Sequence, residues 1–281
     1  MKQTIGIPSA LRLAFAISSV LAAILQAIAV LTAYDTSANY FEQSAILPIL
    51  AVCFAIIGAI CGTVAARMTD TATLNSSPFS KRNAFPYAAL GFLLTAILLV
   101  LYGSAERMNL TPLTSIFLIL AALYSILSEL SDFREKHTTL LTFLGFAAVI
   151  GCILLTAYFY FDVSVEMNAP LKVTTQIGLI TAMVGYTGEI RYLLGKPMPR
   201  VYLMLASWTV AVGSLAALSV PIASLTQKLP RADYAAGAVL VLCLVLTQLM
   251  RIRTLLTKTA HNAQDTPAAD ESEETNGKDL T

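Results

Sequence analysis

Two glutamates, each near the end of a membrane-length apolar run, are the residues whose chemistry stands out. Glu129 lies in "SILSELSDFREK" (125–136) and Glu189 in "MVGYTGEIRYLLGK" (183–196). A carboxylate inside a bilayer is costly, and such residues usually pair with a cation or mark a pathway for ions or protons. We expect the two glutamates to face one another and to hold a proton, a cation or a basic group.

The position of each glutamate in its helix strengthens this interpretation. Both would lie near a helix C-terminus, which carries partial negative charge and favours cations. Water, a basic partner or a bound cation must therefore offset the repulsion. The structural alternative is that each glutamate reaches the membrane interface or pairs with an arginine of a neighbouring helix. Candidate ion-pair partners are Arg191, Arg67 and Arg12.

The run at 172–193 is the most polar of the apolar runs and also carries three glycines. A helix that faced lipid would not have this composition, so we expect it to lie inside a bundle and to line any cavity. Its candidate ion- or solute-contacting residues, besides Glu189, are Gln176, Tyr186 and Thr187. The mid-span amides Gln26 and Gln248 are expected to hydrogen-bond between helices or to line the same cavity, because an unsatisfied amide is costly in hydrocarbon.

Small residues at helical spacing indicate where helices approach closely. In membranes, such residues let backbones pack by dispersion and hydrogen bonding. The expected packing positions are Gly58, Gly62, Ser125, Ser128, Gly185 and Gly188.

The composition indicates that lipid is the solvent for these elements. The chain has 281 residues, of which only 12% are charged, against about 25% in soluble domains. A bilayer core needs about 20 apolar residues per helix. The sequence therefore predicts an all-α, polytopic transmembrane bundle with eight spans, at about 11–33, 45–66, 86–105, 112–131, 138–161, 172–193, 201–225 and 233–252.

Basic residues set the expected orientation of these spans. Of the 18 Lys and Arg residues, 13 fall on the side of the N-terminus, four on the opposite side, and Lys278 in the C-terminal tail. The positive-inside rule then places both termini in the cytoplasm. We expect an integral protein of a bacterial plasma membrane. The first run also resembles a secretory signal, although its length favours a retained helix; cleavage there would leave seven spans.

An internal repeat is one interpretation of the helix order. When 113–130 is aligned with 173–190, Glu129 meets Glu189, and Ser125 and Ser128 meet Gly185 and Gly188. Both runs have the same predicted direction, so the repeat would be a parallel hairpin repeat. Chance similarity between two apolar segments is the alternative.

Two parts of the chain are distinguished by composition: a membrane domain at 1–258 and an acidic tail at 259–281. The tail has six acidic residues, one lysine and no apolar periodicity, so we expect it to be disordered and cytoplasmic. It is a candidate site for a membrane or cytoplasmic protein partner.

The sequence lacks the common catalytic motifs, which reduces the number of plausible function classes. The sequence has no HExxH, CxxC, GxSxG or phosphate-loop motif, and its two histidines lie outside the runs. We therefore expect no metal and no cofactor, and these patterns favour a non-enzymatic function over an enzymatic one. The net charge of +1 does not favour nucleic acid. The sequence favours a transporter of a small solute or ion, or a membrane subunit of one, with a carboxylate-lined cavity on the cytoplasmic side. The alternative is a non-transporting scaffold, assembly partner or sensor.

Overall fold

The structure, a computed structural model, describes residues 7–42, 44–75, 77–79, 86–102, 110–229 and 231–257. The predicted tail 259–281 lies outside these residues. The elements in chain order are α1 (Ile7–Ala33), β1 (Tyr34–Asp35), β2 (Tyr40–Phe41), α2 (Leu47–Met68), a 3₁₀ turn (Thr71–Thr73), α3 (Tyr87–Tyr102), α4 (Leu110–Glu129), α5 (Ser131–Lys136), α6 (Thr138–Tyr160), α7 (Pro170–Leu193), α8 (Pro199–Leu225) and α9 (Ala232–Leu256). The all-helical prediction is confirmed.

Within the described ranges, six helices are long and apolar enough to cross a membrane: α1, α2, α4, α6, α8 and α9. Each coincides with a predicted span. The other two predicted spans correspond to α3, which has only 16 described residues, and to α7, which includes the charged residues Lys172, Glu189 and Arg191. The total of eight spans therefore stays a prediction, as does the hairpin repeat.

Local sequence explains where several helices begin and end. Proline occupies the first turn of α2, α7 and α8, where a missing N–H leaves no hydrogen bond unmade. After α7, Gly195 adopts a φ of +69°, and the backbone N–H of Lys196 donates to the carbonyl of Arg191 at 3.0 Å. A left-handed residue with this back-bonding is a common helix stop, and it fixes the end of α7 shortly after Glu189.

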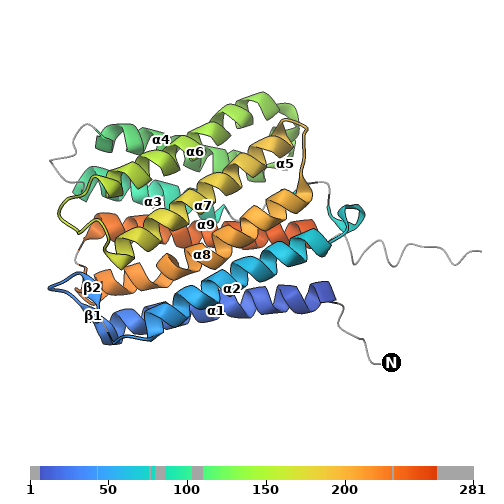
Figure 1. Cartoon of the computed structure of the whole chain (residues 1–281). Helices are drawn as coiled ribbons and strands as arrows, with labels where there is room; N and C mark the ends of the chain where they lie inside the picture. The colour runs from blue at the N-terminus through green and yellow to red at the C-terminus, as the bar shows by residue number, and fades with distance from the viewer. Residues whose placement is uncertain are drawn as a thin grey trace, which may run out of the picture.

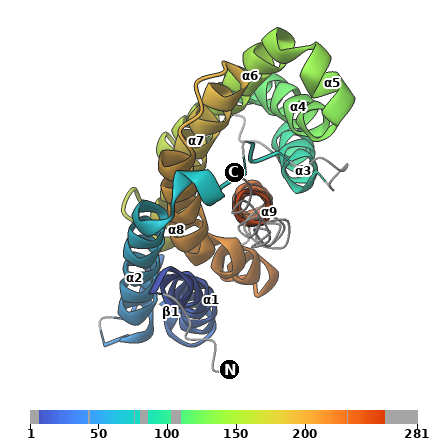
Figure 2. The same ribbon diagram turned by 90° about the vertical axis from the view of Figure 1, so that its right-hand side faces the viewer.

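The long helices lie side by side along a common direction (Figure 1). Seen from the end where α1 begins, α1, α2, α8, α7, α6, α4 and α3 follow an arc, and α9 lies within it (Figure 2). Neighbouring contacts run from α3 through α4, α6, α7 and α8 to α9, which packs back on α3. These six helices form a ring, and α1 and α2 pack on its outside against α8.

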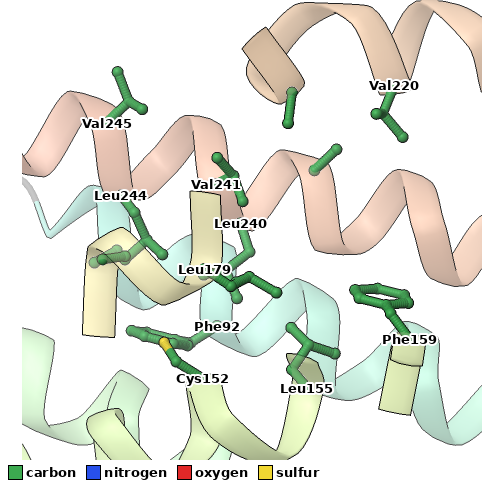
Figure 3. Close-up of a cluster of buried hydrophobic side chains, with 14 of the residues drawn as sticks. Phe92, Cys152, Leu155, Phe159, Leu179, Val220, Leu240, Val241, Leu244 and Val245 are labelled. Carbon is green, nitrogen blue, oxygen red and sulfur yellow. The ribbon is translucent and has the colours of Figure 1, made fainter. Parts of the chain in front are cut away.

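The middle of the ring is filled by apolar side chains. Phe92 of α3, Leu179 of α7 and Leu244 of α9 are buried together (Figure 3). Helix α6 contributes further side chains to this layer from the side away from α9, namely Cys152, Leu155 and Phe159. These side chains form an apolar layer inside the ring.

The outer surface of the bundle is also apolar. On α1, Leu13, Ile17, Val20, Ile24, Ile28 and Leu31 are each at least 40% exposed and recur every three or four residues, which places them on one helix face. A soluble monomer rarely exposes so continuous an apolar face. Together with the six apolar helices, it indicates a multi-pass membrane protein.

Candidate functional site

Glu129 and Glu189 share one guanidinium inside the helix ring. Arg251 of α9 places Nη1 2.7 Å from Oε1 of Glu129 and Nε 3.4 Å from Oε1 of Glu189. The side chains of Glu189 and Arg251 are 0% and 5% exposed. Glu129 is the last residue of α4, and its side chain is 8% exposed. The structure thus brings three charged groups from three helices into one buried cluster.

Glu189 has the more complete set of partners. The hydroxyl of Tyr124 donates to its Oε2 at 3.0 Å. The hydroxyl of Tyr202 lies 3.0 Å from its Oε1, and the amide of Gln248 donates to the same oxygen at 3.3 Å. Hydrogen bonds to a charged group contribute more than neutral ones, so α4, α7, α8 and α9 are tied together at this carboxylate.

The Tyr202 hydroxyl has two acceptors within reach but only one proton. Besides Glu189, it lies 3.0 Å from Oε1 of Gln248. Gly188 makes room for the ring, since a Cβ at that position would lie 2.7 Å from Cδ2 of Tyr202. The glycine before Glu189 therefore allows α8 to approach closely enough to reach the carboxylate.

A loop between α2 and α3 covers the cluster. The ring of Phe79, buried in this loop, has the Cζ of Arg251 4.4 Å and the Cζ of Arg134 5.1 Å from its centroid, both within cation–π range. The backbone N–H of Asn75 donates to the carbonyl of Leu255 at 2.9 Å. The loop thereby satisfies a terminal carbonyl of α9 and holds Phe79 over the arginine.

A small cavity adjoins the three charges. Its volume is about 10 Å³, and its lining includes Tyr124, Ser128, Glu129, Tyr186 and Glu189. Such a volume holds about one water molecule. With both carboxylates ionised, the two glutamates and Arg251 have a formal charge of −1. Arg134, which donates to the carbonyl of Ser128 at 2.7 Å, is the next cation, at the edge of the cluster.

The other predicted contact residues are placed differently from one another. Tyr186 is buried, lines the cavity and packs edge-on against Tyr124 with 5.9 Å between ring centroids. Thr187 is exposed, and Gln176 is half-buried. Gln176 precedes Glu189 by 13 residues, or about 20 Å along the helix. Tyr186 therefore belongs to the cluster, whereas Gln176 and Thr187 do not.

The predicted ion-pair partners lie elsewhere. Arg191 and Arg67 are exposed, and Arg12 donates to the hydroxyl of Thr69 at 2.9 Å. Arg191 follows Glu189 by two residues, and side chains at that spacing point to different faces of a helix. Arg251 takes the position that the sequence assigned to these three arginines.

The predicted packing residues lie at helix contacts, but the distance to the neighbouring helix differs among them. A Cβ on Gly62 would lie 2.5 Å from Cβ of Ser207 on α8, whereas one on Gly58 or Gly185 would make contacts no shorter than 3.3 Å. Ser125 and Ser128 are buried and bond back to carbonyls of their own helix. Of the six predicted packing positions, Gly62 and Gly188 are therefore the two at which an added side chain would collide with a neighbouring helix.

A second charged cluster lies at the opposite end of α9. Arg231 contacts Asp162 at 3.1 Å and Asp233 at 2.6 Å, and the hydroxyl of Tyr158 donates to Asp233 at 3.1 Å. Lys172 donates to the carbonyl of Asp162 at 2.6 Å. Burial acts to lower the pKa of Arg231, but the hydrogen bonds and charge of Asp233 and the charge of Asp162 outweigh it and raise that pKa.

Sequence reasoning missed most of the residues around the glutamates. From the sequence alone, Arg251 is only a flanking basic residue and Tyr202 only an expected interfacial aromatic, and nothing distinguishes Tyr124 or Phe79. One signal was present: Gln248 and Arg251 are three residues apart and so share a helix face. Within the described ranges, no three His, Cys, Asp or Glu side chains are grouped so that they could hold a metal ion. Comparison with protein-family models, curated proteins and solved structures found no match to this chain.

Proposed function

We propose that this protein is a membrane transporter for a small cation, or a membrane subunit of one, in which Glu129 and Glu189 exchange Arg251 for a proton or a cationic solute. The observation that carries the proposal is the sharing of one guanidinium by two buried carboxylates. With both glutamates ionised, their two negative charges exceed the single positive charge of Arg251 by one.

The membrane arrangement behind this proposal has eight spans, with both termini in the cytoplasm of a bacterial cell. Two observations support counting α3 and α7 as spans: both belong to the helix ring, and each packs between neighbours that are apolar enough to cross a bilayer. The excess of basic residues at the end of the bundle that holds Glu129 and Glu189 supports a cytoplasmic location for that end.

Electrostatics explains how the cluster would couple two cations. An uncompensated charge in a low-dielectric interior is expensive, so each added positive charge weakens the hold of the carboxylates on Arg251. A proton on Glu129 would neutralise that carboxylate and so remove its 2.7 Å ion pair with Arg251. The ion pair between Arg251 and Glu189 would remain. A cationic solute would compete with the guanidinium in the same way. Binding of a proton and of a solute would thus depend on each other.

Side chains cover the cluster from two directions in the described conformation. Phe79 covers Arg251 from the basic end of the bundle. The apolar layer of Phe92, Leu179 and Leu244 separates the cluster from the opposite end (Figure 3). Access to the glutamates would therefore require movement of the Phe79 loop or of α9 relative to its neighbours, as expected for alternating access.

The test is cation-driven proton movement in proteoliposomes that contain the full chain and an entrapped pH-sensitive dye. Vesicles with an acidic interior are challenged in turn with Na⁺, K⁺, choline and spermidine. We expect at least one of these cations to dissipate the pH gradient faster than in vesicles without protein. Glu189→Gln should abolish that effect, and Glu135→Gln, at an exposed position of α5, should retain it. Equal dissipation by wild type and Glu189→Gln would contradict the proposal.

A non-transporting assembly module or sensor is the second candidate. It is favoured by the small size of the cavity, about 10 Å³, and by the dense bonding of Glu189, both of which suit a purely structural cluster. In that case, removal of residues 260–281 should abolish the cellular phenotype, whereas Glu129→Gln and Glu189→Gln should leave it intact. The reverse pattern would favour transport.

A further inference from the structure

We propose that a groove at the basic end of the bundle binds one anionic phospholipid, with an acyl chain between the helices and the phosphate against two arginines. The groove is lined by residues that include Arg12, Ala16, Ala65, Leu203, Ile252 and Arg253; we call it the Arg12–Arg253 groove. It is separate from the Glu129–Glu189 cluster, and the inference does not depend on transport.

The groove arises from how four helices meet. Helices α1, α2 and α9 each pack against α8, and the groove lies between them with Leu203 and Ser207 of α8 in its lining. Ala65 and Ala66 of α2 and Ala16 of α1 have side chains too small to fill the space. Its volume is about 400 Å³, within the range of about 300–1,000 Å³ that is common for ligand sites.

The charges at the groove suit an anion. Arg12 uses Nη2 to bond Thr69, while its Nε is buried and has no hydrogen-bond partner among the described residues. Arg253 is exposed at the end of α9. Among the residues that the structure describes, no acidic side chain lines the groove. Basic pockets between membrane helices on the cytoplasmic side are a recurrent form of anionic headgroup recognition.

The apolar character of the remaining lining favours a lipid over other anions. Apart from the two arginines, Ser207 and Thr257, the groove is lined by glycine and apolar residues. An inorganic phosphate would leave these walls uncovered, and the acidic tail 259–281 has no apolar run with which to cover them. A phospholipid supplies both the hydrocarbon chain and the negative charge, and the surrounding bilayer supplies the phospholipid.

Native mass spectrometry of the detergent-purified full chain, titrated with dioleoyl phosphatidylglycerol or dioleoyl phosphatidylcholine, tests this inference. We expect one phosphatidylglycerol to bind in preference to phosphatidylcholine. Arg12→Gln and Arg253→Gln should each weaken phosphatidylglycerol binding about five-fold, the factor that corresponds to about 1 kcal/mol per basic residue near an anionic surface. Ala16→Phe, which keeps both arginines but fills the groove from an exposed position, should also weaken it.

Arg67→Gln is the matched control, because Arg67 is exposed on α2 but does not line the groove; it should bind like wild type. Equal binding of the two lipids would overturn the inference, as would wild-type binding by all three groove variants. A chain that ends at residue 257 and binds phosphatidylglycerol much more tightly than the full chain would also overturn it, because the acidic segment would then be the native occupant.

Discussion

Arg231 and Arg251 lie at opposite ends of α9, and each is held by two carboxylates. Arg231 contacts Asp162 and Asp233, whereas Arg251 contacts Glu129 and Glu189. The two arginines are 20 residues apart in the sequence, or about 30 Å along a helix. This length equals the hydrocarbon thickness of a bilayer, also about 30 Å. Helix α9 thus has an apolar middle and a charged anchor near each expected interface.

Removal of Arg251 should strongly destabilise the protein. Arg251→Gln leaves two buried carboxylates without their cation, and loss of one member of a buried ion pair costs about 3–5 kcal/mol. Equilibrium unfolding in mixed micelles measures this cost. Arg191→Gln, at an exposed position of α7, should change the unfolding free energy by less than about 0.5 kcal/mol. Equal stability of the two variants would contradict the buried ion pair.

Arg231 should contribute less to stability than Arg251. The Arg231 side chain is 27% exposed, against 5% for Arg251, and solvent screens the charges that a lost arginine leaves behind. We therefore expect Arg231→Gln to reduce the unfolding free energy by less than Arg251→Gln. Added salt should reduce the effect of Arg231→Gln more than that of Arg251→Gln. A larger effect at Arg231, measured under the same conditions, would be inconsistent with these exposures.

The tyrosine hydroxyls around Glu189 should contribute measurably to stability. Tyr202→Phe removes the hydroxyl 3.0 Å from Glu189, and a hydrogen bond to a charged group is worth about 1.5–3 kcal/mol. Tyr192→Phe is the natural control, because the Tyr192 hydroxyl has no hydrogen-bond partner among the described residues and its ring packs on that of Tyr202. Thermal unfolding of the two variants should differ, with the loss confined to Tyr202→Phe.

Packing across the inside of the ring can be tested at Gly237 on α9. A Cβ there would lie 2.5 Å from Cζ of Phe159, so Gly237→Ala should displace the Phe159 ring, which reaches α9 from α6, and cost about 1–3 kcal/mol. At Gly151 the nearest atoms would lie 3.4 Å away, which is ordinary contact, and Gly151→Ala should be tolerated. If both variants unfold at the same temperature, the packing of Phe159 on Gly237 is wrong.

Apolar run length predicted most of the fold, because the bilayer imposes a minimum length on each spanning helix. Helices such as α6 (Thr138–Tyr160) coincide with their predicted spans almost residue for residue. Hydropathy does not identify α7 as a span, because a helix buried in a bundle can carry charged residues such as Glu189 and Lys172 when partners satisfy them. Helix α3 falls short by length, with 16 described residues.

The candidate site was predictable only in part. Glu129 and Glu189 stand out because carboxylates are rare in apolar runs. Arg251 does not stand out, because an arginine at the end of an apolar run is also typical of a residue at the membrane interface. Its inward direction depends on the rotation of α9 against α3 and α8. The position of Phe79 depends on how a polar loop folds back over the end of α9, and no helical periodicity encodes that.

The shared carboxylate pair is tested most directly by pH-difference infrared spectroscopy of the full chain in a bilayer. We predict a carboxyl C=O band that appears on acidification, is lost in both Glu129→Gln and Glu189→Gln, and is retained in Glu135→Gln. A spectrum in which neither Glu129→Gln nor Glu189→Gln changes the carboxyl bands would show that the cluster binds no proton, and would contradict the exchange of cations at Arg251.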